Sequence, residues 1–571
     1  MTMVEPAKLT RAEATARLTG PGGDFEIVRE TIRGVEVKVW KNAPRSLRDV
    51  LAGSAAHGDQ TFLVYEGEHL SFARHLRAVA AFANVLRERY GVAKGDRVAI
   101  AMRNYPEWSI AFWGAAAIGA IVVPLNAWWK GAELEYGLSD SGSKFLIADE
   151  QRFDELRDRY QSLPLAGVAV ARARGDLPRG IERFEDLFAS GSGDVDLPAV
   201  EIEPEDDATI FYTSGTTGLP KGALGTHRNI CSNLTSLEFL GKQRELRLGL
   251  VPPAEPPKLA SLLSVPFFHV TGCHSTLVPA LKLGSKVVLV YKFVPEQVVE
   301  LIERERITSF GGVPSIAWQV LEAANFGKHD LSSVLRIGYG GAPAAPDLVR
   351  RLNQTFPNVA LSNGYGLTES SSVTSSNAGD DYLRKPTSVG PPVPVCELKV
   401  VDDDGRELPL GEAGELWIKG PNIIKGYWNK PEATAKTITD GWLHSGDVAR
   451  LDDEGFIHLV DRKKDIVIRG GENVYCVEVE AALCEHPEVL DAAVFGIPHR
   501  VLGEEVAAAV KVRNGSTLDA DELREHAAAR LARFKVPVKI TIRQEDLPRN
   551  PNGKILKREL REEMVRSAVV E

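Results

Sequence analysis

Short apolar runs alternate with segments of helical spacing along most of the chain. Residues 97–102, 120–125 and 144–149 are apolar runs of the kind that form buried strands. Helical spacing fills the segments between them, and the same alternation returns over residues 286–314 and again after residue 335. Because strand–helix–strand repeats build βαβ units, the pattern predicts an α/β fold of largely parallel sheets covered by helices on both faces.

The pattern changes after about residue 385. Residues 397–420 contain paired short strands separated by acidic, glycine-marked turns, which predicts a small β-rich subdomain. The charged segment 461–465 follows, and helices and strands alternate from there to the C-terminus. We therefore expect a large N-terminal domain over residues 1–460 and a small α+β C-terminal domain over residues 466–571.

One uncharged stretch is long enough to cross a membrane. No Asp, Glu, Lys or Arg lies between Glu107 and Lys130. The stretch divides at Gly119 into a helix-like half and a β-branched half, and Pro124 would interrupt a spanning helix near its end. The sequence therefore favours a buried helix followed by a core strand over a transmembrane span, and leaves peripheral membrane contact open.

Composition narrows the function classes. The chain is 44% hydrophobic and 26% charged, as in ordinary globular proteins. Its net charge of −10 argues against an extended nucleic-acid surface but not against a small positive pocket for a nucleotide. Five cysteines without a CxxC pair and an N-terminus without an apolar run predict a reducing, cytoplasmic setting. The histidines are not spaced as metal ligands, so we expect no zinc.

The segment 212–222, YTSGTTGLPKG, combines glycines, hydroxyl side chains and a lysine between two predicted strands. It lacks the Gly-Lys-Ser/Thr of a Walker loop. Its glycines nevertheless allow several backbone N–H groups to point into one concavity, which is a way to bind phosphate oxygens. A plain surface turn is the alternative, which the density of hydroxyls disfavours. The candidate phosphate contacts are Thr213, Ser214, Gly215, Thr216, Thr217, Gly218 and Lys221.

Three further segments are weak signals when taken singly. In NGYGLTE (363–369), Tyr365 lies between glycines and can lay its ring on a base, while Glu369 is a hard oxygen ligand suited to Mg²⁺. In HSGD (444–447), Asp447 follows a glycine turn and can accept both hydroxyls of a ribose. Near the C-terminus, Lys554 follows a Pro/Asn/Gly turn, where lysines are usually solvated.

Together and in this order, these segments resemble the signatures of the adenylate-forming superfamily. That superfamily contains acyl-CoA synthetases, firefly-type luciferases and peptide-synthetase adenylation domains, and the fatty-acid–CoA ligases are the most similar. The charged DRKKD segment, the GGENV that follows it and residues 414–428 match further signatures. The resemblance covers nearly the whole chain and is weakest over the N-terminal extension, residues 1–50, for which a lid, a dimer contact and a dock for lipid-bearing surfaces all stay open.

The resemblance implies that ATP, Mg²⁺ and coenzyme A bind to this chain. The nucleotide site would comprise the loop at 212–222 together with Gly341, Ala342, Pro343, Asn363, Gly364, Tyr365, Gly366, Thr368, Asp447, Arg462 and Lys554. Tyr365 would stack on the adenine, and Asp447 with Arg462 would hold the ribose hydroxyls. The implied catalytic residues are Lys554, Thr368, Glu369 and His269, with Glu369 as the Mg²⁺ ligand.

The resemblance also implies an acyl pocket and a moving domain. The segment 265–275 would supply the pocket residues Phe267, Phe268, His269, Val270, Gly272 and Cys273. His269 is either a gate over the substrate carboxylate, which we favour, or a satisfied core histidine. Residues 461–465 would be a hinge centred on Lys464, about which the small domain rotates to bring Gly470 and Gly471 to a tunnel for coenzyme A.

The reaction that the resemblance implies explains why a lysine and a divalent cation are needed. The resemblance implies that a carboxylate attacks the α-phosphorus of ATP, so that two anions must meet. At about 4 Å and an effective dielectric near 20, one such pair repels by about 4 kcal/mol. Positioning and charge neutralisation suffice, and no nucleophilic side chain is required.

The expected function is an ATP-dependent acyl-CoA ligase for a hydrophobic carboxylate. A medium- or long-chain fatty acid is the first expectation, and aryl acids stay open. The absence of an acidic residue from 265–275 disfavours an amino-acid substrate. The alternatives are an enzyme that stops at acyl-AMP or passes the acyl group to a carrier protein, and a nucleotide-binding protein without catalysis. Monomer and homodimer are both compatible with the sequence.

Overall fold

Two eight-stranded sheets form the centre of the large domain in the computed structural model, which describes residues 9–189, 196–213, 219–250, 257–341, 346–550 and 553–570. The first sheet is parallel except for β11, which runs antiparallel to both of its neighbours, β10 and β20. Its strands lie in the order β20 (Gly426–Tyr427), β11 (Lys221–Thr226), β10 (Asp207–Thr213), β6 (Ile121–Pro124), β5 (Arg97–Ala101), β7 (Phe145–Asp149), β8 (Gly167–Ala171) and β9 (Glu182–Arg183).

The second sheet is parallel except at its two ends, where β17 and β4 run antiparallel to their neighbours. Its order is β17 (Ser375–Ala378), β16 (Ala360–Tyr365), β15 (Arg336–Gly340), β14 (Ser309–Gly312), β12 (Ala260–Leu263), β13 (Lys286–Leu289), β3 (Thr61–Tyr65) and β4 (Glu68–Ser71). The largely parallel α/β architecture predicted from the sequence is therefore confirmed.

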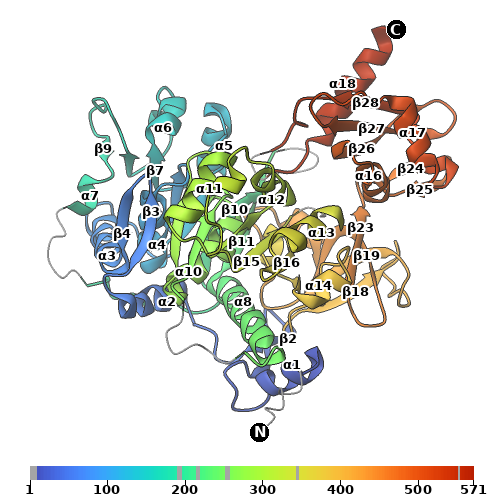
Figure 1. The fold of residues 1–571 in the computed structure, drawn as a ribbon. Helices are drawn as coiled ribbons and strands as arrows, with labels where there is room; N and C mark the ends of the chain where they lie inside the picture. Colours follow the sequence, from blue (N-terminus) through green and yellow to red (C-terminus); the bar gives the residue numbers. More distant parts are fainter. Residues whose placement is uncertain are drawn as a thin grey trace.

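Helices fill the space between and around these sheets (Figure 1). One face of the second sheet packs on α11 (Pro295–Arg304), α12 (Pro314–Leu321) and α13 (Pro346–Thr355). Its other face packs toward α4 (Pro106–Ala117), α10 (Val278–Leu283) and the long α8 (His227–Arg247). The first sheet is flanked by α3 (Phe72–Glu88), α5 (Gly131–Ser141) and α6 (Glu150–Leu156).

The uncharged stretch that raised the question of a membrane forms most of the buried helix α4 and the strand that follows it. Every residue of α4 is buried, and the helix contacts strands of both sheets. The chain then continues directly into the buried strand β6. The prediction of a buried helix followed by a core strand is thus confirmed. Within the described residues, no helix combines the length and hydropathy that a bilayer crossing requires.

Two smaller units complete the chain. An antiparallel sheet of β18 (Glu397–Val401), β19 (Gly414–Lys419), β22 (Trp442–Leu451), β21 (Ile438–Thr439) and β23 (Ile457–Arg462) forms the β-rich subdomain. The C-terminal unit, red in Figure 1, has a sheet of β25 (Glu472–Val474), β24 (Val467–Arg469), β27 (Gly503–Val512), β26 (Val489–His499) and β28 (Lys539–Arg543), with helices α16 (Cys476–Cys484), α17 (Ala520–Ala528) and α18 (Lys557–Val570). It has its own apolar core, centred on β26, β27 and α16.

The N-terminal segment is folded against the large domain. It contains α1 (Arg11–Thr19), the hairpin β1 (Ile27–Ile32) and β2 (Val35–Trp40), and α2 (Leu47–Gly53). Trp40 packs on Phe25 and on Phe239 of α8, and its Nε1 donates a hydrogen bond of 3.0 Å to Ser236 Oγ. Figure 1 shows α1 lying beside one end of α8.

Candidate active site

A cavity of about 2360 Å³ lies where the large domain, the β-rich subdomain and the C-terminal unit meet. The carboxyl ends of β10, β15 and β16 open into it, as do residues 444–447 of β22. Such strand ends are where ligands bind in open α/β sheets. Residues 553–559 of the C-terminal unit line the same cavity, so both parts of the chain build its walls.

Lys554 reaches from the C-terminal unit into this cavity. Its Cε lies 3.9 Å from the position that a Cβ on Gly341 would take. Gly341 directly follows β15 and has a φ of +73°. Burial, assisted by the positive charge of Arg462, lowers the pKa of Lys554 to about 8, although the carboxylates of Asp447 and Glu369 act in the opposite direction. The ammonium therefore lies near residues that the sequence predicted to bind ATP.

Asp447 is held by two side chains, one on each oxygen. Tyr365 Oη donates to its Oδ2 at 2.7 Å, and Arg462 Nε lies 3.0 Å from its Oδ1. The strands bring this about, since Asp447 of β22 stands directly opposite Arg462 of β23. Tyr365 ends β16 with its ring packed on the core of the β-rich subdomain, and burial raises its pKa well above the usual value. The carboxylate thus has a fixed orientation at the edge of the cavity.

Asn363, two residues before Tyr365 on β16, has a buried hydrogen-bond acceptor. Asn363 is almost fully buried and lines the cavity, but its Oδ1 has no hydrogen-bond partner among the described residues. Buried polar atoms in native proteins are normally paired, so this oxygen fits the place of a ligand donor such as the amine of an adenine. The residues present therefore fit a nucleotide at this end of the cavity.

Glu369 has a partner that the sequence reasoning did not single out. Tyr427 Oη donates to Glu369 Oε1 at 2.7 Å, and Lys221 Nζ lies 5.0 Å from the centroid of the Tyr427 ring. Tyr427 is in β20, which pairs with β11, the strand that begins at Lys221. The segment 414–428 was recognised as a signature, but its pattern alone did not indicate that its tyrosine joins the lysine to the acid.

The carboxylate of Glu369 suits a magnesium ion that a bound ligand also coordinates. In the part of the chain that the structure describes, no three His, Cys, Asp or Glu side chains are grouped to hold a metal. Mg²⁺ in nucleotide sites commonly takes one or two carboxylates together with phosphate oxygens and water. Glu369 as a single carboxylate beside the cavity fits that arrangement.

Only part of the segment predicted for the acyl pocket lines the cavity. Phe268, His269 and Val270 do so. Burial, with a contribution from the charge of Lys554, lowers the pKa of His269 to about 3, so its imidazole is neutral. Its Nε2 is buried and has no hydrogen-bond partner within the described ranges.

The remaining predicted pocket residues face the protein core instead. Phe267 is fully buried and stacks on Trp108 of α4, with ring centroids 4.9 Å apart. Cys273 is buried in the same apolar cluster, and Gly272 packs against the backbone of Pro266. Neighbours in a turn cannot all point to one side, which is why a contiguous sequence segment overestimates the pocket.

Part of the cavity lies over an area of the second sheet, here called the bare area, where the side chains are only those of glycine and serine. On one sheet face, Gly340 pairs with Gly364, and Gly338 pairs with both Gly311 and Ser362. These residues line the cavity, as does Ser309 of β14. Further along the same face, Leu263 of β12 and Val287 and Leu289 of β13 pack in the core instead. Glycine and serine leave a space where larger residues would have filled it.

Of the other predicted residues, Thr213, Gly366, Thr368 and Lys464 also line the cavity. Gly470 and Gly471 form the exposed turn between β24 and β25, with φ of +60° and +91°, and are not among the lining residues. Seven predicted residues lie outside the described residues: Ser214, Gly215, Thr216, Thr217, Gly218, Ala342 and Pro343.

The comparison with family models identifies the family of this chain. Residues 51–428 match the AMP-binding enzyme model, and residues 478–554 match the AMP-binding enzyme C-terminal domain. The chain belongs to the AMP-binding enzyme family. One relative, a long-chain-fatty-acid–CoA ligase from Yersinia pestis, is 34% identical over 535 residues, which cover 89% of this chain and 92% of that protein.

Other proteins similar to this chain have names that indicate different substrates or products. A feruloyl-CoA synthase from an Amycolatopsis species is 35% identical over 501 residues, covering 88% of this chain and 95% of its own. An amide bond synthetase from Marinactinospora thermotolerans has a TM-score of 0.79 at 29% identity, covering 91% of this chain and 99% of that chain. The o-succinylbenzoate–CoA synthetase from Bacillus subtilis, solved with its acyl-adenylate, has a TM-score of 0.74 at 29% identity, covering 90% and 98%.

Proposed function

We propose that the protein is an ATP-dependent acyl-CoA ligase for long hydrophobic carboxylic acids. It would form acyl-AMP and pyrophosphate from the acid and ATP, and then acyl-CoA and AMP from acyl-AMP and coenzyme A. One observation carries this proposal: the buried Lys554 ammonium meets the end of a long cavity beside the Asn363–Asp447 pocket. A cation at this junction suits the approach of two anionic reactants.

In the first step, an oxygen of the substrate carboxylate attacks the α-phosphorus and the pyrophosphate leaves. Lys554 would neutralise the carboxylate and the α-phosphate, and Asp447 with Arg462 would hold the ribose. Glu369, Thr368 and Lys221 would bind on the phosphate side. A magnesium ion held by Glu369 and the phosphates would supply further charge neutralisation.

In the second step, the thiol sulfur of coenzyme A attacks the acyl carbon and AMP leaves. Lys554 occupies the cavity between the domains, where the thiol arm must enter. We infer that the C-terminal unit rotates about residues 461–465, which withdraws Lys554 and carries Gly470 and Gly471 inward. His269, neutral and next to Phe268, would act as the gate at the reacting carboxylate.

The preference for a long acid rests on the bare area of the second sheet. The cavity continues from Gly340 at the carboxyl end of β15 to Arg336 at its start, a distance of about 13 Å at ~3.3 Å per residue. An apolar chain fits this space better than a short or charged acid. The relative named as a long-chain-fatty-acid–CoA ligase supports the same choice, whereas the feruloyl-CoA synthase keeps aryl acids as a second group to test.

A second candidate is an enzyme that forms acyl-AMP and transfers the acyl group to an acceptor other than coenzyme A. The structural likeness to an amide bond synthetase favours including it. A reducing, cytoplasmic setting suits both candidates, since all five cysteines are free thiols.

The test is a pair of assays on the full chain with acids graded from acetate to palmitate and several aryl acids. Pyrophosphate exchange measures the first step, and coenzyme A consumption measures the second. We expect exchange with long acids, which Lys554→Ala lowers by about 100- to 1000-fold, while Lys328→Ala, at an exposed position, does not change it. Exchange without coenzyme A consumption would select the second candidate, and no exchange with any acid would contradict both.

A further inference from the structure

Arg549 lies shortly before Lys554 in the chain and binds two acceptors at once. Its Nη2 donates to Asp491 Oδ2 of β26, and its Nη1 donates to the backbone carbonyl of Gly553, the residue directly before Lys554. All four residues line the cavity. One guanidinium therefore joins a strand of the C-terminal unit to the part of the chain that carries the Lys554 ammonium.

Further contacts fix the backbone of Lys554. The Asn550 N–H donates to the Lys554 carbonyl at 2.8 Å, and the Lys554 N–H donates to Asn550 Oδ1 at 3.0 Å. Gly553 has a φ of +77° and faces the large domain, where a Cβ on this glycine would lie 2.6 Å from Val313 Cγ2. The position of Lys554 thus depends on its own segment, on the contact with Val313 and on the guanidinium that holds the Gly553 carbonyl.

Asp491 depends on Arg549 to carry its charge. Burial raises the pKa of Asp491, and the positive charge of Arg549 acts in the opposite direction. Lys511, which stands opposite Asp491 on β27, acts in that direction too, but its Nζ is bound to Asp546. Removal of Arg549 alone would leave a buried carboxylate without its hydrogen-bonded cation, which destabilises a fold strongly. The arginine and the aspartate therefore form a unit, and a test has to change both.

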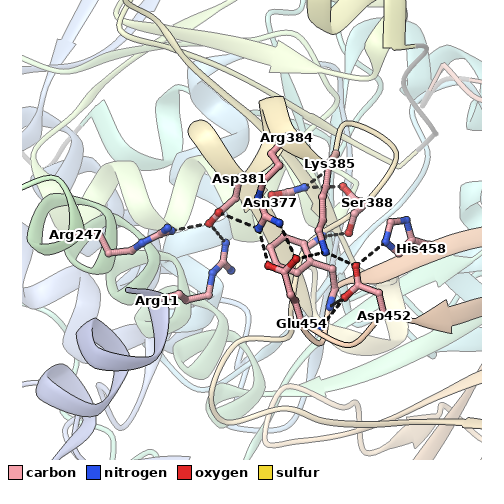
Figure 2. Close-up of polar contacts among 12 residues, drawn as sticks. Arg11, Arg247, Asn377, Asp381, Arg384, Lys385, Ser388, Asp452, Glu454 and His458 are labelled. Carbon is pink, nitrogen blue, oxygen red and sulfur yellow. Dashed lines mark hydrogen bonds and ion pairs between the residues drawn. The ribbon is translucent and has the colours of Figure 1, made fainter. Parts of the chain in front are cut away.

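An ion pair of similar burial outside the cavity provides a comparison. Figure 2 shows Asp381 accepting hydrogen bonds from Arg247 at 2.7 Å and from Arg11 at 2.6 Å. These bonds join α8 and α1 to the segment that carries Asp381, and none of the three residues is among the described residues that line the cavity. The side chains of the Arg549–Asp491 pair are 25% and 27% exposed, against 26% and 12% for Arg247–Asp381. The two pairs thus differ mainly in what they hold.

We propose that Arg549, held by Asp491, is a positioning residue for Lys554 in the formation of acyl-AMP. It acts through the Gly553 carbonyl and touches neither reactant. This proposal rests on the proposed function and adds to it the pair that sets where the Lys554 ammonium stands. Such a device matters because a displacement of about 1 Å from the productive geometry costs about hundredfold in rate. Since Lys554 is withdrawn in the second step, the pair should matter for the first step alone.

The experiment measures both half-reactions of the full chain with palmitate. Pyrophosphate exchange reports the first, acyl-CoA formation from preformed palmitoyl-AMP reports the second, and the quantity compared is the ratio of the two kcat/KM values. In the Arg549→Gln/Asp491→Asn double variant, which leaves neither charge without its partner, we expect this ratio to fall about ten- to hundredfold. The control, Arg247→Gln/Asp381→Asn, should keep the parental ratio, although it also removes the ion pair with Arg11.

Two readouts distinguish positioning from a general effect on the fold. In a Lys554→Ala background, the double change should lower exchange no further, because residues that act as a unit are not additive. In the double variant with Lys554 intact, the alkaline fall of exchange should move to higher pH, because a lysine released from its buried position regains its ordinary pKa. An unchanged ratio, an unmoved alkaline fall, or an equal further loss in the Lys554→Ala background would overturn the proposal.

Arg549→Lys carries the test if the double variant does not fold. A lysine keeps a positive charge beside Asp491, but its single nitrogen cannot span the carboxylate and the Gly553 carbonyl as the guanidinium fork does. We expect the ratio to fall about tenfold in this variant, and a parental ratio would contradict a role through Gly553. Failure of the parent chain to exchange pyrophosphate with any acid would instead contradict the proposed function itself.

Discussion

Lys554 is a cation in a place where water is scarce, and its pKa of about 8 follows from that position. Burial disfavours the charged form, and Arg462 adds repulsion, while Asp447 and Glu369 reduce the penalty. The anionic reactants would reduce it further, so the ammonium becomes more stable once they bind. In the free enzyme, however, the Lys554 ammonium loses its proton within the pH range that an assay covers.

The lowered pKa of Lys554 predicts that pyrophosphate exchange depends on pH. The ammonium is present below the pKa and is lost as pH rises through about 8, so kcat/KM for pyrophosphate exchange should fall above that pH. Lys554→Arg keeps a charge at all these pH values, so the variant should be slower but should lack this fall. The measurement is a kcat/KM profile from pH 6 to 10. The same alkaline fall in both enzymes would show that another group titrates.

A second prediction concerns the Tyr427 hydroxyl, which orients Glu369. Tyr427→Phe removes one hydrogen bond to a carboxylate but keeps the ring beside Lys221, so the loss should be about 1.5–3 kcal/mol at most. We expect about a tenfold weaker binding of ATP in the presence of Mg²⁺, measured by calorimetry, and a smaller change without Mg²⁺. Tyr160→Phe, at the start of a short 3-10 helix, is the matched control. Equal losses with and without Mg²⁺ would contradict a role through Glu369.

At the scale of elements, the cavity that we propose for the acyl chain is a property of one sheet face rather than of a sequence segment. The register of β14, β15 and β16 sets Gly311, Gly338 and Ser362 side by side. Over β13, the same face carries Val287 and Leu289, which are buried in the core. Because the strands are parallel and come from separate βαβ units, small residues far apart in the sequence combine into one bare surface.

This arrangement predicts that one larger side chain shortens the cavity. Ser362→Leu places a leucine in the middle of the bare surface, so kcat/KM for palmitate should fall at least about tenfold relative to hexanoate, which is about 1.4 kcal/mol. Ser162→Leu, at an exposed position, should keep the parental ratio. The readout is pyrophosphate exchange across the graded acids. Parallel loss for short and long acids would indicate damage to the fold rather than a shorter pocket.

The sequence predicted the elements well and the cavity poorly, for a physical reason. Hydrophobic periodicity is local, so β5, β6 and β7 and the buried α4 could be recognised from short windows. The cavity depends on strand register and on which face a residue occupies, which no window contains. Phe267 and Cys273 illustrate this, because their apolar character suits a core as well as a pocket. Tyr427 was visible as part of a signature, but its contact with Glu369 exists only after β20 pairs with β11.

At the scale of the whole molecule, the polar contacts between the described parts of the C-terminal unit and of the rest include exposed or peripheral ones. Arg513 reaches Glu322 at 3.4 Å across the surface, and Asp461 accepts a hydrogen bond from the backbone N–H of Cys476. Gly553 packs near Val313. Exposed ion pairs of this kind contribute little, typically below about 1 kcal/mol. Rotation of the small unit would break these contacts at little cost, which is consistent with the two-step reaction that we propose.

Lys464 is the position at which this rotation can be tested. Its side chain is exposed, and its backbone N–H donates no hydrogen bond within the described chain, whereas the N–H of the next residue, Asp465, donates to the carbonyl of Arg462 at 2.8 Å. Proline at 464 would thus remove no bond from the present conformation, but it fixes φ near −65° and restricts the preceding residue. The substitution should preserve the state in which Lys554 occupies the cavity and obstruct the turn of the hinge.

We expect Lys464→Pro to retain pyrophosphate exchange within about threefold, below 1 kcal/mol, and to slow acyl-CoA formation from preformed acyl-AMP at least about tenfold. Lys464→Ala is the control, because it removes the charge that acts on Lys554 but leaves the backbone free. If alanine behaves like proline, the effect is electrostatic. If proline slows both half-reactions equally, the hinge does not separate them, and Lys554 and the coenzyme A thiol must share the cavity without rotation of the small unit.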